Sequence, residues 1–172
     1  MEYISYRIKD ILESEFVSTI QKINEKMEAE DIVNFGAPVV LYEPEEYNVG
    51  MYSVNVAFTP SITIYNSRIS YDIQEWGTAG VIRLPIVIEI NIKSDSPATL
   101  EVLKDRYLIA LLNILSRHPR LDIKTNDEIV ESMTISNSDL KIVTHSPKNH
   151  VIYCELNVSV LTYDVYKHYG LD

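Results

Sequence analysis

The sequence RLPIVIEINIKSDSP, at residues 83–97, decides the fold that we expect for this chain. Isoleucine fills every second position of its central part, and this two-residue period is typical of a strand with one buried face. Ser96 and Pro97 suit the N-cap and the first position of a helix, so we expect Ser96 to cap a helix that begins at Pro97. The stretch therefore predicts a strand over Arg83–Lys93, followed by a helix that runs to about Ser116 and is most buried in its C-terminal half.

Two further segments carry regular patterns. Apolar residues recur at steps of three and four from Ile4 to about Glu30, which predicts a long amphipathic helix with an acidic solvent-facing side. Apolar and polar residues alternate from Val151 to Tyr163, which predicts a long antiparallel strand. The element order predicts one α+β domain over residues 1–172, with a mainly antiparallel sheet, a long N-terminal helix and a second helix packed on one face.

Shorter strands are expected from local alternation and from turn residues. Asn66-Ser67 suits a turn, so we expect the strands on either side of it to pair as a hairpin. The sequence Ser136-Asn137-Ser138-Asp139 is also expected to be a turn, which ends the strand before it. The expected short strands are Pro38–Tyr42, Met51–Thr59, Ile62–Tyr65, Ile69–Ile73 and Ile129–Ile135.

Charge and hydropathy exclude several classes of function. The chain has 15 basic and 25 acidic residues, and a net charge of -10 repels the phosphate backbone, so we expect no specific nucleic-acid binding. Residues 1–48 hold 11 of the acidic and four of the basic side chains, so the acidity is concentrated there. The apolar run Leu108–Leu112 is far too short to cross a bilayer, and the first residues lack the features of a signal peptide. We expect neither a membrane nor export.

No pattern that carries chemistry emerges from the chain. Cys154 is the single cysteine, and its spacing from His145, His150 and His168 matches no common zinc site, so no metal is expected. The five glycines are scattered and form no phosphate-binding loop, and no serine lies in a nucleophile elbow. We therefore expect no cofactor and no catalysis.

Tyrosine is in excess, with 12 residues against one tryptophan and three phenylalanines. Tyr and Trp are enriched at protein interfaces because they combine a large apolar area with a polar tip. We expect the segment Asn66–Val81 to project from the sheet and to contact another subunit or a partner. In the alternative interpretation, its tryptophan covers the core beneath a loop. The predicted interface residues are Tyr65, Tyr71, Ile73 and Trp76.

The element order resembles that of the tail-terminator or tail-completion (neck) proteins of long-tailed bacteriophages. The resemblance rests on the opening helix Ile4–Met27 and on the strand Leu84–Ile90, which runs into Ser96-Pro97 and the helix Leu100–Leu115. The closing strand Ile152–Val160 completes it. It covers most of the chain and implies a small α+β subunit with a hairpin that extends from the sheet.

The resemblance implies a structural virion protein, made in the host cytoplasm, that forms a ring at the head-proximal end of the tail. The ring is typically a hexamer, ends polymerisation of the tail tube and meets the head connector, so the implied partners are further copies, the tail tube protein and the connector protein. DNA would pass through the lumen without specific binding, and the family has no catalytic residues. The alternatives are another neck or baseplate adaptor subunit, or a small cytoplasmic ligand-binding or enzymatic α+β domain.

Overall fold

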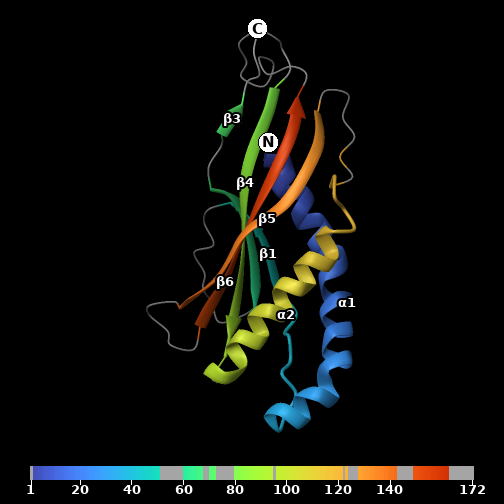
Figure 1. Ribbon diagram of the computed structural model, residues 1–172, viewed down its shortest axis with the longest axis vertical. Coiled ribbons are helices and arrows are strands. Elements are labelled where there is room, and N and C mark those ends of the chain that lie inside the picture. Colours follow the sequence, from blue (N-terminus) through green and yellow to red (C-terminus); the bar gives the residue numbers. More distant parts are fainter. Residues whose placement is uncertain are drawn as a thin grey trace.

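The computed structural model describes residues 2–50, 60–67, 70–72, 80–94, 96–121, 123, 128–142 and 149–162. Within these residues, two helices cover one face of a six-stranded, mostly antiparallel sheet, which confirms the expected α+β class (Figure 1). The helix α2 runs obliquely across the sheet, and α1 lies beside it (Figure 1). The elements are α1 Glu2–Phe35, β1 Glu46–Val49, β2 Ser61–Asn66, β3 Ser70–Asp72, β4 Gly80–Lys93, α2 Pro97–Leu115, β5 Glu128–Ile142 and β6 Asn149–Thr162.

The sheet has the order β1-β2-β4-β6-β5, and β3 pairs with the N-terminal end of β4. All of these pairs are antiparallel except β1 with β2. Strands β4 and β6 form the centre and pair along their whole length, from Gly80 opposite Thr162 to Lys93 opposite Asn149. Their alternation explains this position, because every second residue of both strands enters the core under the two helices.

The core lies between the helices and the inner face of the sheet. Helix α1 contributes a stripe at steps of three and four residues, and α2 contributes mainly its C-terminal two thirds. Both helices predicted from the sequence are therefore confirmed, and α1 extends beyond its predicted end to Phe35. Fully buried core residues include Ile8, Leu12, Phe16, Ile86, Ile88, Ile90, Tyr107, Leu111, Leu156 and Val158.

The hairpin expected around Asn66-Ser67 is wrong. Strands β2 and β3 run in the same direction and pair in succession with β4. The break between them lies beside Pro85, whose carbonyl accepts a hydrogen bond from Ser67 N at 3.1 Å. In an antiparallel ladder the carbonyl and the N–H of a residue point the same way, so the N–H that Pro85 lacks would also face this break. A proline is thus tolerated in a central strand because its partner strand is interrupted there.

Two other predictions about local structure are also wrong. The sequence Ser136-Asn137-Ser138-Asp139 forms no turn but lies inside β5, with a register shift between Ile135 and Asn137. Turn-prone residues here mark a bulge rather than a chain reversal. The segment Pro38–Tyr42 is extended but joins no strand, and the sequence analysis missed β1 after it. The strand expected over Met51–Thr59 lies outside the described residues.

Candidate interaction surface

Of the four predicted interface residues, the structure describes the side chain of Tyr65 alone. Tyr65 lies in β2, is half-buried, and donates a hydrogen bond to Glu89 Oε1 at 2.8 Å, so its polar tip is engaged within the subunit. Burial is the main cause that raises the pKa of Tyr65. Tyr71 lies in β3 opposite Ile82, with its side chain outside the description. Ile73 and Trp76 lie outside the described residues, so their role at an interface stays a prediction.

Of the histidine and cysteine residues considered as metal ligands, the structure describes Cys154 and His150. Cys154 is fully buried in β6, and burial raises its thiol pKa to about 11, so the thiol stays protonated at neutral pH. His150 is buried at the start of the same strand, whereas His145 and His168 lie outside the described residues. Among the residues that the structure describes, no group of three or more His, Cys, Asp or Glu residues has a geometry that could hold a metal ion.

Residues 38–42 form a strap that runs between the two helices (Figure 1). Side chains of both helices bind its backbone as a neighbouring strand would. Asn24 of α1 donates to Leu41 O at 3.0 Å and accepts from Leu41 N at 2.9 Å. The Tyr107 hydroxyl of α2 does the same for Tyr42, accepting from its N–H at 2.8 Å and donating to its carbonyl at 2.9 Å. The strap is therefore ordered without belonging to a sheet.

A buried ion pair fastens the same strap. The Asp31 carboxylate at the end of α1 and the Arg106 guanidinium of α2 are only 2% and 7% exposed, and one of their hydrogen bonds measures 2.7 Å from Nη1 to Oδ2. Asp31 also accepts from Val39 N, and Arg106 donates to Val39 O, both at 3.0 Å. The hydrogen bond from Arg106 holds the pKa of Asp31 below its ordinary value, against the effect of burial. The pair joins both helices and the strap at one point.

Sequence reasoning missed this pair because it grouped Arg106 with the other charged residues of the first half of α2. A signal existed, since Arg106 falls between Leu103 and Ala110 on the apolar stripe of that helix. A charged residue at a core-facing position requires a buried partner. Asp31 occupies the equivalent place on α1, four residues after Met27.

A groove of about 780 Å³ lies on the outer surface between α1 and α2. We call its apolar side chains the floor and its exposed lysines, Lys22 and Lys26, the rim; these cations stand out because the chain as a whole carries -10. Asp105 is the one acidic residue that lines it. The apolar lining consists of Ile23, Met27, Val102 and Ile109, and the cationic lining consists of Lys22, Lys26, Arg106 and Arg117.

Exposed apolar side chains gather at the end of α1 and on the strap. Five of the eight large apolar side chains that are exposed in the described part lie there, between 42% and 83% exposed. Such a concentration at one end of a subunit is typical of a surface that contacts another protein. The five residues are Ile32, Val33, Phe35, Val40 and Tyr42.

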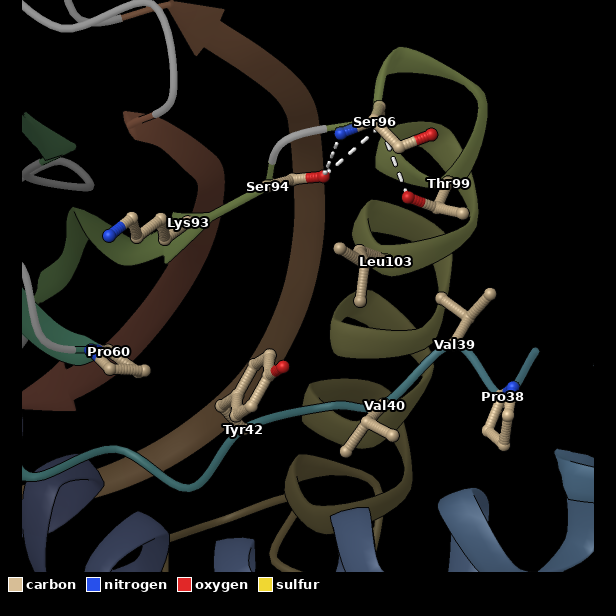
Figure 2. Close-up of a pocket in the computed structure, with 10 residues that line it drawn as sticks. All are labelled: Pro38, Val39, Val40, Tyr42, Pro60, Lys93, Ser94, Ser96, Thr99 and Leu103. Atoms are coloured by element: carbon tan, nitrogen blue, oxygen red, sulfur yellow. Dashed lines mark hydrogen bonds between the residues drawn. The ribbon is translucent and has the colours of Figure 1, made fainter.

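A second hollow, of about 510 Å³, lies between the strap and the start of α2 (Figure 2). Two of its hydroxyl groups bond to the chain itself: Ser94 Oγ accepts from Ser96 N at 3.3 Å, and Thr99 donates to Ser96 O at 3.1 Å. The expectation that the Ser96 side chain caps α2 is wrong, because its hydroxyl makes no capping bond. Pro97 does occupy the start of the helix, as predicted. Lys93 supplies the charge in this hollow.

The chain was compared with protein families, curated proteins and solved structures. No family model and no curated protein sequence matches the chain. A chain from a structure described as "Virion of native gene transfer agent (GTA) particle" is similar over 67% of this chain and 78% of that one, with 8% sequence identity and a TM-score of 0.48. Among the described residues, no helix is long and apolar enough to cross a membrane.

Proposed function

We propose that the protein is a structural virion subunit that assembles with copies of itself into a hexameric ring at the head-proximal end of a phage tail. The ring ends polymerisation of the tail tube and joins the tail to the head connector. The observation that carries this proposal is the exposed apolar surface at the end of α1 and on the strap, because a subunit that worked alone would have reason to bury it.

The arrangement of the elements supports the same assignment. The long opening helix, the strand that runs into a proline-led helix and the long closing strand are the features on which the resemblance to tail-terminator proteins rests, and all three are present. The buried ion pair and the strap hold the two helices at a fixed spacing, which suits a subunit that must present a rigid surface.

The proposal assigns no reaction, cofactor or metal to the protein. In the hollow at the start of α2, the Ser94 and Thr99 hydroxyl groups are bonded to the backbone of Ser96 (Figure 2). A net charge of -10 on each subunit also suits a lumen through which DNA passes without adhering. No specific observation in the described part of the chain favours the alternative of a ligand-binding or enzymatic domain.

The partner distinguishes this role from that of another neck or baseplate adaptor. Purified protein is mixed with tail tubes assembled from the cognate tail tube protein and viewed by electron microscopy. A terminator caps one end of each tube and limits its growth. Tubes that stay uncapped and grow as without the protein, while the protein binds the connector or a baseplate component, would move the assignment to an adaptor.

The segment Asn66–Val81 keeps its predicted place at a subunit or partner contact. Trp76→Ala is expected to weaken assembly more than it lowers the melting temperature of the subunit, because an aromatic anchor at an interface carries about 2 kcal/mol or more of binding free energy. Light scattering and thermal unfolding measure the two effects on the same sample. Unfolding of the variant subunit, with assembly retained in the folded fraction, would place Trp76 in the core.

A further inference from the structure

We infer that the groove between α1 and α2 receives the side of α1 from a second copy of the same chain. The part that it receives is the acidic flank, which we define as Glu25, Glu28, Ile32 and Phe35. The inference rests on the proposed self-assembly and specifies which two surfaces meet.

The groove has the chemistry of a site for an acidic amphipathic helix. Its floor offers apolar side chains from both helices, among them Ile23 and Ile109, and Ile109 is exposed by 49%. Lys22 and Lys26 on its rim are exposed, and no ion-pair or hydrogen-bond partner of theirs occurs among the described residues. Arg117 adds a cation that is held by Glu15 at 2.8 Å. The two lysines can therefore pair with acidic side chains of another protein, and the apolar floor can bury its apolar side chains.

The acidic flank supplies both kinds of group on one helix. Glu25, Glu28, Ile32 and Phe35 are all exposed and follow the spacing i, i+3, i+7 and i+10, which places them on one side of α1. Ile32 and Phe35 are the apolar residues for the floor, and the two glutamates match the two lysines of the rim. The groove and the flank are thus complementary in hydropathy and in charge.

The apolar parts of the two surfaces lie on opposite sides of the same helix. Ile23 in the groove and Ile32 on the flank are nine residues apart, which is about 900° of rotation and leaves them about 180° from each other around the axis. A subunit cannot fill its own groove with its own flank. The contact is therefore heterologous, with the flank of each copy in the groove of the next, and this is the type of contact that closes into rings.

Charge reversal in the full-length protein tests the contact. The groove variant carries Lys22→Glu and Lys26→Glu, and the flank variant carries Glu25→Lys and Glu28→Lys. Each is expected to weaken self-association by about 100-fold or more, because like charges then face each other across the contact. Sedimentation velocity over a concentration series measures association, and circular dichroism checks that each variant keeps its fold.

Two comparisons separate this contact from a general charge effect. The control Arg83→Glu with Arg120→Glu changes the net charge as much as the groove variant does, at exposed residues outside the groove, the flank and the strap, and should leave most association intact. The flank variant lowers the net negative charge, so the subunits repel each other less. If only overall repulsion mattered, this variant would associate more strongly than the wild type, whereas the inferred contact predicts that it associates more weakly. The fourfold variant and an equal mixture of the two double variants should both regain association.

The outcomes distinguish this contact from the proposed ring. Rings that form equally well with the groove variant overturn the contact but leave the ring. Association into open chains of variable length, lost in each double variant and regained in the fourfold variant, keeps the contact and overturns the ring. Wild-type protein that stays monomeric at every concentration overturns the contact, while capping of tail tubes tests the proposed function separately.

Discussion

At the scale of single residues, the polar groups beneath the surface decide how the helices and the strap are held. Asp31 and Arg106 satisfy each other and both backbone groups of Val39, so neither charge is left unpaired in the interior. Sequence periodicity located both helices, although the first was expected to end near Glu30, just before Asp31. It could not pair Asp31 with Arg106, because they are 75 positions apart and only the packing of α1 on α2 brings them together.

Removing one member of this pair is expected to cost far more than removing both. Asp31→Asn leaves the Arg106 charge buried without its counter-charge and should lower the free energy of unfolding by about 3–5 kcal/mol. The double variant Asp31→Leu with Arg106→Met should lose less, because no charge stays buried. Urea denaturation of the variants measures this. Equal losses in both variants would contradict the account.

The pair also predicts how stability depends on pH. Because the pKa of Asp31 is lower in the folded protein than its ordinary value of 3.8, the carboxylate stabilises the fold above that value, and this stabilisation is lost as pH falls through the folded pKa. Unfolding free energy between pH 7 and pH 3, from urea titrations, should fall more steeply for the wild type than for the Asp31→Leu, Arg106→Met variant. Parallel curves would show that Asp31 does not contribute.

At the scale of elements, the strong periodic segments were predictable and their pairing was not. The alternation in β4 and β6 and the apolar stripes of α1 and α2 determine what each element is, because each can bury only one face. Pairing depends on features outside the local pattern. Pro85 leaves a gap in the ladder where β2 gives way to β3, and the bulge in β5 absorbs a run of turn-prone residues. The backbone of the strap is hydrogen-bonded to side chains of both helices, and no local sequence pattern predicts these bonds.

The hydrogen bonds at the start of α2 predict how two serine substitutions affect stability. Ser96→Ala should change the free energy of unfolding by less than about 0.5 kcal/mol, since the Ser96 hydroxyl makes no capping bond. Ser94→Ala should cost about 1 kcal/mol, because it removes the acceptor of Ser96 N and the donor to Ser96 O. Thermal or urea unfolding compares the two variants. A larger loss from Ser96→Ala would restore that residue as the cap.

At the scale of the whole molecule, the subunit separates a rigid core from the surfaces that we assign to assembly. The element order predicted an α+β domain, no motif predicted catalysis, and the tyrosine excess directed attention to the segment Asn66–Val81. These patterns did not reveal the groove or the acidic flank, because both depend on how α2 packs against α1. Exposed isoleucine and phenylalanine in the last turns of a helix are visible only when its buried side is known.

The mass of the assembled protein tests the ring most directly. Light scattering across a concentration and salt series, joined to electron microscopy of the species found, gives copy number and shape. Ionic strength matters because subunits with a net charge of -10 repel one another over a screening length of about 8 Å at physiological salt. The account predicts a closed ring of fixed copy number, six in the proposed form, that appears at high concentration or on tail tubes. A compact monomer under every condition that also fails to bind tail tubes would contradict it.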